Sequence, residues 1–183
     1  MEAKACLVDD EPVVAKPARR MEDTLQAFAI RAACFIGEQD VPYSQEFDGQ
    51  DFGATHMVAY VRNEPVGTLR IRWFQSFAMP ERLAVVQRFR GHRIGQLLLD
   101  RARALAESRG CNVLYTRASS GQATYFEKQG WRRLDSEQTP RAQGDVALIR
   151  PVDPAGQTAE IADTDAIALS RQYRLDPSPS ADA

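Results

Sequence analysis

The sequence has little of what defines several large protein classes. Only three of its 183 residues are cysteine (Cys6, Cys34 and Cys111), and their spacing fits neither a disulfide framework nor a Cys-x-x-Cys metal site. The longest unbroken apolar runs, Ala32–Ile36 and Met57–Val61, are far shorter than the roughly 20 residues of a membrane-spanning helix. We therefore expect no metal, no membrane segment, and reduced cysteines in a cytoplasmic protein.

Lysine is also scarce, since 20 of the 23 basic residues are arginine. The net charge of −2 lacks the basic excess of a general nucleic-acid-binding protein. Asp9, Asp10 and Glu11 fall where the apolar region of a secretory signal would lie. We expect neither a nucleic-acid partner nor such a signal.

Charge is distributed unevenly along the chain. Residues 38–51 carry five acidic side chains and no basic one, whereas residues 82–93 carry four arginines and His92. Residues 151–183 hold six acidic residues against Arg171 and Arg174. Because the length suits one domain, we expect a domain over residues 1–150 and an acidic, partly disordered tail over 151–183.

Apolar periodicity predicts a mixed α/β fold. Residues 22–37 have helical spacing, and residues 55–62 and 66–74 resemble a β-hairpin. In the second of these strands Leu69, Ile71 and Trp73 alternate with polar residues, which predicts one buried face.

The centre of the chain predicts a βαβ unit. It would consist of a strand at 82–86, a basic loop, a helix from residue 94 to Gly110, and a strand at 111–117. A shorter helix at 122–129 and a hairpin of 131–134 with 146–150 would complete the domain. We therefore expect antiparallel strands joined to a βαβ unit in one mixed sheet.

The basic loop Arg88–Gly95 has the composition of an anion site. A helix N-terminus offers unpaired N–H groups, Gly91 and Gly95 permit close approach, and the arginines can bind phosphate oxygens. A solvated basic loop with a capping glycine would give the same pattern. The GxGxxG and GxxxxGK[ST] motifs are absent from the sequence, which disfavours dinucleotide-binding and P-loop folds.

Two segments resemble a known family. Leu83–Leu99 resembles the acyl-CoA-binding motif of the GNAT superfamily of N-acyltransferases, in which an apolar strand is followed by R/Q-x-x-G-x-G/A. Arg90, Gly91 and Gly95 match that motif, and Arg93 replaces its first G-x-G glycine. Ala123–Trp131 is similar to a later family segment, but with Tyr125-Phe126 in place of Phe-Tyr.

The resemblance implies a GNAT-like fold and acetyl-CoA as cosubstrate. The residues that it places around the cofactor are Leu83, Ala84, Val85, Val86, Arg88, Arg90, Gly91, His92, Arg93, Ile94, Gly95, Gln96 and Phe126. Within this set the resemblance makes Val85 the residue whose N–H faces the thioester oxygen. Phenylalanine has no ionisable proton, so we expect Phe126 not to protonate the thiolate, and Tyr125 to face elsewhere and pack.

A second likeness lies upstream. Arg31-x3-Phe35-x2-Glu38 and the acidic residues that follow, with Gly67-Thr68-x-Arg70, resemble the ElaA-like branch of the superfamily and overlap a pattern of acyl-homoserine lactone synthases. The chain has an R-G-x-x-I-G loop that those synthases lack, which favours the acetyltransferase side. We expect Glu38, Asp48, Asp51 and Arg70 to contact the acceptor.

Two residues are candidates for the general base. Glu81 lies four residues before Val85, on the same strand face if alternation is regular, and family members often have a carboxylate there. His56 is the other, because imidazole titrates near neutral pH.

Three functions fit the sequence. The first is an N-acetyltransferase that acetylates a primary amine of a small molecule or protein by direct attack. The second is an acyltransferase that makes an N-acyl amino acid or an acyl-homoserine lactone from a longer acyl donor. The third is a non-catalytic acyl-CoA sensor. A homodimer is compatible with each.

Overall fold

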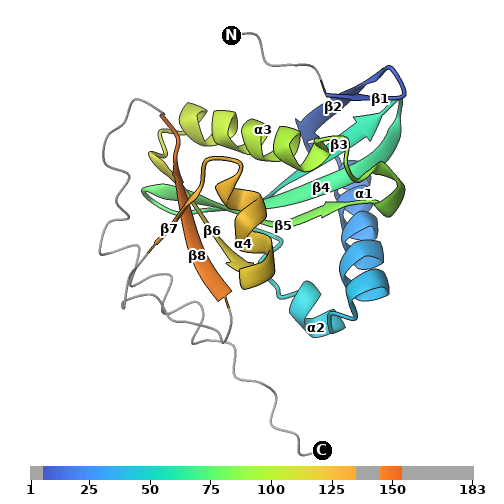
Figure 1. The fold of residues 1–183 in the computed structure, drawn as a ribbon. Coiled ribbons are helices and arrows are strands. Elements are labelled where there is room, and N and C mark those ends of the chain that lie inside the picture. Colours follow the sequence, from blue (N-terminus) through green and yellow to red (C-terminus); the bar gives the residue numbers. More distant parts are fainter. Residues whose placement is uncertain (1–5, 135–144, 154–183) are drawn as a thin grey trace, which may run out of the picture.

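The computed structural model describes residues 6–134 and 145–153. Within this part the strands form one sheet in the order β1-β2-β3-β4-β5-β6-β8-β7 (Figure 1). The strands are β1 (Leu7–Val8), β2 (Glu11–Pro17), β3 (Thr55–Val61), β4 (Glu64–Trp73), β5 (Phe77–Val85), β6 (Val113–Ser119), β7 (Arg132–Arg133) and β8 (Asp145–Pro151). The helices are α1 (Met21–Arg31), α2 (Tyr43–Glu46), α3 (Ile94–Ser108) and α4 (Ser120–Glu127), with a π-helix at Ala32–Gly37 and a 3-10 turn at Gln87–Phe89.

Strands β5 and β6 are the parallel neighbours in this sheet, and the other pairs are antiparallel. The β5-α3-β6 unit confirms the predicted βαβ arrangement, and the sheet and helices confirm the mixed α/β fold. The parallel pairing covers only Phe77 with Val113 and Ala78 with Leu114. Beyond these residues β5 still pairs with β4 and β6 with β8, but β5 and β6 no longer pair with each other, so they diverge.

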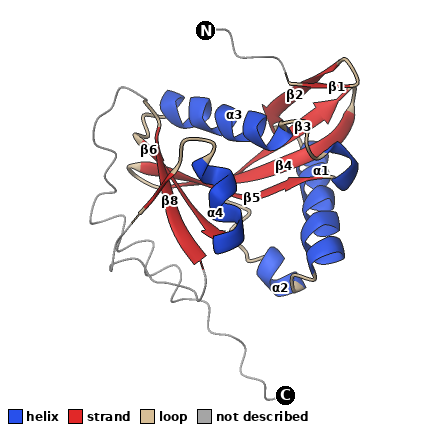
Figure 2. Cartoon of the chain, in the orientation of Figure 1, coloured by secondary structure: helices blue, strands red, loops and turns tan. Residues whose placement is uncertain are grey.

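Helices cover both faces of the sheet (Figure 2). The apolar side of α3, including Ile94, Leu98 and Leu99, joins α4 and strand residues such as Leu69 in the largest buried cluster. On the opposite face α1 packs Ala27 and Ile30 against β3 and β5. The divergent ends of β5 and β6 therefore lie within a helix-covered part of the molecule.

The first helix departs from the continuous α-helix predicted over residues 22–37. The α-helical part ends at Arg31, and Ala32–Gly37 forms a π-helix, in which the hydrogen bonds run to the fifth residue along. Residues 32–36 are apolar, and this composition cannot distinguish the two helix types. A further short helix, α2, lies in the acidic segment of residues 38–51.

Strand β4 corrects the expectation of one buried face. Leu69 and Ile71 are buried on one side as predicted, but Thr68, Arg70 and Arg72 are also buried. Alternation of apolar and polar residues failed here because the polar side chains have partners inside the protein, as described below.

The described domain continues past the predicted boundary at residue 150. Val152 is 2% exposed, its N–H donates to the carbonyl of Asn112, and its carbonyl accepts from Arg103. Residues 154–183 of the predicted tail lie outside the described part of the chain. Among the helices of residues 6–134 and 145–153, none has the length and hydrophobicity needed to cross a bilayer.

Candidate active site

A cleft of about 730 Å³ opens where β5 and β6 separate. The strand walls include Met79, Pro80 and Glu81 of β5 and Thr116 of β6, whose hydroxyl donates to the Pro80 carbonyl at 2.7 Å. The other lining residues are Phe35, Asp48, Gln50, Leu69, Arg72, Arg82, Leu83, Leu99, Arg117, Gln122, Tyr125 and Phe126. The cleft therefore combines an apolar wall with several charged side chains.

A β-bulge in β5 determines which side chains face which way. Arg70 is opposite Glu81 and Thr68 is opposite Ala84, so β5 has one residue more than β4 in this stretch. Arg82 takes up the difference with a left-handed φ of 52°. Glu81 is consequently out of phase with Leu83, contrary to the regular alternation that we expected, and its carboxylate meets Arg70 and Arg72.

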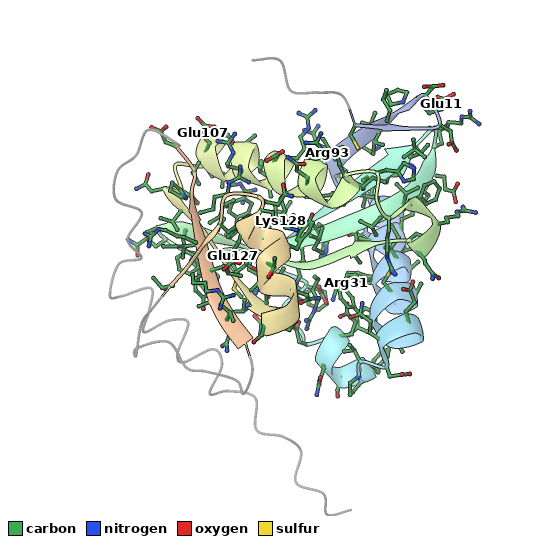
Figure 3. The ribbon with its side chains drawn as sticks, in the orientation of Figure 1. Glu11, Arg31, Arg93, Glu107, Glu127 and Lys128 are labelled. Atoms are coloured by element: carbon green, nitrogen blue, oxygen red, sulfur yellow. The ribbon has the colours of Figure 1, made fainter. Side chains whose placement is uncertain are left out.

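The carboxylates of the acidic segment are bound by arginines from elsewhere in the chain. Arg31 and Arg70 are fully buried, and both contact Asp51, at 2.5 and 3.0 Å. Arg31 also pairs with the buried Glu46, while Arg70 donates to both oxygens of Asp48 at 2.6 Å (Figure 3 labels Arg31). Taken alone, residues 38–51 seemed to have no counter-charge, because these arginines lie outside that segment.

We call this group of charges the ion cluster. Its eight members are Arg31, Glu46, Asp48, Asp51, Arg70, Arg72, Glu81 and Arg82. Burial alone would raise the pKa of Asp48, but the hydrogen bonds and charge of Arg70, helped by Arg82, lower it to about 2. The pKa of Asp51 is lowered in the same way, by Arg31 and Arg70 against the effect of burial. Asp48 and Asp51 therefore stay ionised at neutral pH.

The two candidate bases occupy different environments. Glu81 lines the cleft, and its Oε1 accepts from Arg70 Nε at 3.0 Å and Arg72 Nε at 2.5 Å. Its Oε2 accepts from Arg72 at 3.2 Å. His56 is 6% exposed, packs edge-on against Phe28, and is not among the residues that line the cleft. Burial lowers the pKa of His56, so it is neutral and enclosed rather than presented to an acceptor.

Two residues of the predicted anion loop have positive φ values. Gly91 has a φ of 88°, and Arg93, at the N-cap of α3, has a left-handed φ of 62°. Arg93 thus adopts the conformation that the family's usual glycine favours. Its side chain is exposed at the end of α3 opposite Glu107 (Figure 3). The N–H groups of the first turn, from Ile94 onward, have no partner within the helix.

The arginines of this loop have different surroundings. Arg88 is exposed and pairs with Glu64, and Arg93 donates to Gln96 at 3.0 Å. Arg90 turns back toward the sheet, where Nε donates to the Val85 carbonyl at 2.9 Å and Nη2 pairs with Glu38. The hydrogen bond that Arg90 donates to Glu38 raises the pKa of Arg90. Glu38, predicted to contact the acceptor, is thus bound to the anion loop.

The other predicted cofactor residues differ in how close they lie to the cleft. Leu83 and Phe126 line the cleft directly. Ala84 and Ile94 have buried side chains, so only their backbone groups could contact a ligand. Val85 and Val86 are half-buried, and His92 has its Nδ1 3.3 Å from the Phe89 carbonyl.

The placement of Tyr125 corrects our expectation. It does not face away and pack as a substitute for phenylalanine: it lines the cleft and is 38% exposed, whereas Phe126 is 8% exposed and packs against Trp131. A Cβ at Gly95 would lie 2.7 Å from the Tyr125 hydroxyl, so this hydroxyl sits against the first turn of α3. Burial, with a contribution from Asp100, raises the pKa of Tyr125.

Sequence reasoning also missed Arg72, Arg82, Thr116, Arg117 and Gln122, all of which line the cleft. The spacing of Arg70 and Arg72 on β4 could have predicted part of this site. Two residues apart, they share one face of an apolar strand, and buried arginines require carboxylate partners. Arg82, Thr116, Arg117 and Gln122 line the cleft because β5 diverges from β6, and their local sequence does not indicate this divergence.

Comparison with known proteins identifies the family. The acetyltransferase (GNAT) domain matches residues 52–133. A *Bacillus subtilis* (strain 168) protein named as a candidate acetyltransferase is 31% identical over 119 residues, which is 63% of this chain and 81% of that protein. The chain belongs to the GNAT family. Its members are acyl-CoA-dependent N-acyltransferases, and this chain is one of them.

Solved structures share the GNAT fold. *Escherichia coli* ElaA is 18% identical, with a TM-score of 0.64 over 75% of this chain and 99% of that one. A GNAT family acetyltransferase from *Elizabethkingia anophelis*, with acetyl-CoA bound, is 15% identical, with a TM-score of 0.60 over 76% and 97%. At these identities the likeness concerns the fold.

Proposed function

We propose that the chain is an N-acetyltransferase that transfers the acetyl group of acetyl-CoA to a primary amine by direct attack. The observation that carries the proposal is the open cleft between β5 and β6, next to a loop with the left-handed turns of an anion site. The *Elizabethkingia* relative of this fold binds acetyl-CoA.

The residues present fit that cosubstrate. Gly91 has open space around its α-carbon, and the first turn of α3 provides N–H groups for a pyrophosphate. The end of β5, which pairs with β4 but not with β6, and Val86 after it would offer the backbone groups of Leu83–Val86 to the pantetheine arm. Acetyl-CoA would supply an activated acyl carbon and a thiolate leaving group.

In the proposed reaction the amine nitrogen bonds to the acyl carbon and the carbon–sulfur bond breaks. Glu81 accepts the amine proton on Oε2, which has one arginine contact and so retains acceptor capacity. The Val85 N–H stabilises the oxyanion, a role taken from the resemblance. Tyr125 donates its phenolic proton to the departing thiolate and recovers one from solvent.

Two measurements on the full chain test the proposal. CoA and acetyl-CoA should raise the unfolding temperature, since ligand at 100 times its Kd stabilises by about 2.7 kcal/mol. Acetyl-CoA with a panel of amines should release free thiol in proportion to acetylated product, and longer acyl-CoAs should react less well. No thermal shift with either CoA species would refute the proposal.

A matched pair of variants tests the assignment of the base. Glu81→Gln should lower kcat by about 10²–10⁴-fold, the usual contribution of a general base. His56→Gln should leave kcat within a few-fold, because His56 is not among the cleft-lining residues. The reverse order would make His56 the base.

A further inference from the structure

The opening between β5 and β6 begins at a defined residue of β5. On the β4 side, the N–H of Phe74 donates to the Phe77 carbonyl at 3.0 Å. On the β6 side, the N–H of Asn112 donates to the Ser76 carbonyl at 3.2 Å. Backbone groups of successive strand residues face opposite neighbours, so every second residue from Ser76 to Pro80 faces β6.

Pro80 ends the hydrogen-bond ladder between β5 and β6. Ala78, two residues earlier, is still in register with Leu114. A proline has no N–H, so Pro80 cannot donate the next hydrogen bond to β6. Proline is normally confined to the edges and bulges of sheets, whereas β5 lies between β4 and β6. The residue type at position 80 therefore accounts for the place where the cleft begins.

Thr116 closes the cleft at the same level. Its hydroxyl donates to the Pro80 carbonyl at 2.7 Å, from β6 across to β5. This hydrogen bond holds the two strands together just beyond the last paired residues, Ala78 and Leu114. Thr116 is buried although it lines the cleft, and so is Met79, which places both in its inner part. We call Pro80 and Thr116 the floor pair.

The floor pair lies at the end of the cleft remote from the anion loop. That loop follows the C-terminal end of β5, whereas Pro80 precedes the bulge at Arg82. An acyl-CoA with its pyrophosphate at the loop and its arm along Leu83–Val86 directs its thioester end toward Pro80. The carbons of a longer acyl group would extend further in that direction. The space for them ends where Thr116 joins the two strands.

From this arrangement, and resting on the proposed function, we propose that Pro80 and Thr116 determine the length of the acyl group that the enzyme accepts. Pro80 ends the ladder and so opens the cleft, and Thr116 limits the depth of the opening. An acetyl group fits above the floor pair, whereas a longer acyl group meets the Thr116 side chain. Both are specificity-determining residues, because neither gives a proton or a charge to the reaction.

A series of donors tests this inference on the full-length chain. Values of kcat/KM are measured for acetyl-, butyryl- and hexanoyl-CoA with one amine that the wild-type protein acetylates. Thr116→Ala should raise the hexanoyl-to-acetyl ratio about tenfold or more, since a pocket discriminates about 10–200-fold for one methylene. Thr116→Ser keeps the hydroxyl and should stay closer to wild type. An unchanged ratio in a folded Thr116→Ala variant would overturn the inference.

Thr68→Ala is the matched control. Thr68 is also buried, and its hydroxyl donates to the Met57 carbonyl at 2.8 Å, from β4 to β3, but it is not among the cleft-lining residues. This variant should leave the donor ratio unchanged. An equal rise in both variants would reflect a general loosening of the sheet and would refute the role of Thr116. CoA affinity should stay within a few-fold in both, because CoA ends at its thiol.

Pro80→Ala tests the other member of the floor pair in the opposite direction. It restores an N–H that can donate to β6, so the ladder can continue past Ala78 and the cleft should become shallower. The butyryl-to-acetyl ratio should then fall several-fold. A constant or increased ratio would contradict the role of Pro80. This variant carries the test if Thr116→Ala does not fold.

The outcomes separate this inference from the proposed function. Acetyl transfer by the wild type, with donor ratios that the variants do not change, would leave the N-acetyltransferase in place and refute only the role of the floor pair. Absence of acetyl transfer to any amine, despite CoA binding, would refute both. A wild-type preference for hexanoyl-CoA would also refute both, since neither acetyl-CoA as donor nor a floor at Thr116 would then hold.

Discussion

Two arginines hold strained backbone conformations at either end of the segment proposed to bind acyl-CoA. Arg82 creates the bulge of β5, and Arg93 begins α3, both with positive φ. A left-handed conformation costs an L-residue about 1–2 kcal/mol. Such strain is common at functional sites, where the chain path matters more than local stability.

The strain at Arg93 can be relieved. Arg93→Gly should leave stability unchanged or raise it by up to about 1 kcal/mol, because glycine adopts this φ without a steric cost. Arg88→Gly, in the 3-10 turn with no such strain, is the control and should lower stability by about 0.5–1 kcal/mol. Urea unfolding of both variants measures the difference. Equal destabilisation by the two glycine substitutions would contradict the presence of backbone strain at Arg93.

The hydroxyl of Tyr125 is proposed to protonate the thiolate. Tyr125→Phe should lower kcat by about 10²–10⁴-fold while CoA affinity stays within a few-fold, since only the proton donor is lost. Tyr43→Phe is the control, because Tyr43 is 70% exposed on α2 and does not line the cleft. Steady-state kinetics and CoA titration provide the measurement. Unaltered turnover in Tyr125→Phe would leave solvent as the proton source.

At the scale of elements, the ion cluster fastens the segment between α1 and β3 to the sheet. Arg31 at the end of α1 binds Glu46 of α2 and Asp51, and Arg70 of β4 binds Asp51 and Asp48. These contacts hold Asp48 against the cleft. A buried pair of this kind is weak evidence for net stabilisation, but removing one partner leaves an uncompensated charge.

Glu46→Gln should therefore be strongly destabilising. Glu46 is fully buried between Arg31 and Arg82, so its neutralisation should lower the free energy of unfolding by about 3–5 kcal/mol. Glu11→Gln breaks the exposed pair with Arg62 and should cost less than about 1 kcal/mol. Denaturant unfolding at neutral pH compares them. Similar small losses in both would show that the cluster does not support the fold.

The low pKa of Asp48 predicts how the stability of the protein changes in acid. Its pKa of about 2 lies below that of the unfolded chain, about 3.9, so native Asp48 stays ionised where the unfolded carboxyl is protonated. The contribution of Asp48 to the free energy of unfolding, on the order of 2 kcal/mol, is complete above about pH 4 and is lost as the pH falls toward 2. Asp48→Asn should therefore be less stable than wild type at pH 6, with the difference shrinking by pH 2.5. A constant difference across this range would contradict the ionic role.

The sequence predicted the elements better than the details of the site. The βαβ unit follows from local apolar spacing around the loop Arg88–Gly95, and the glycines and arginines of this loop are the reason why it is proposed to bind an anion. The bulge at Arg82 and the π-helix at Ala32–Gly37 each shift side chains by one residue without a compositional signal. The partners in the ion cluster are distant in sequence, so no local pattern could pair Arg31 with Asp51.

At the scale of the whole molecule, Val152 is buried although it lies beyond residue 150, where the domain was predicted to end. A chain that ends at Asp153 should fold and bind CoA like the full-length protein, because Val152 and its backbone hydrogen bonds remain. A chain that ends at Arg150 loses them and should be less stable by about 2–4 kcal/mol, from one buried aliphatic side chain and two hydrogen bonds. Thermal unfolding of the two truncations tests this, and equal stability would show that Val152 is dispensable.

The short parallel pairing between β5 and β6 has a consequence for how far the sequences of this family can differ. Beyond Ala78 and Leu114 the two strands form an internal edge, with backbone groups that neither offers to the other. Exposed edges usually recruit other chains, but this one borders a cleft that residues of α4 also line. Main-chain donors and acceptors are the same whatever the side chains. Recognition of an acyl carrier through such an edge would survive extensive substitution, which fits a fold shared with ElaA at 18% identity.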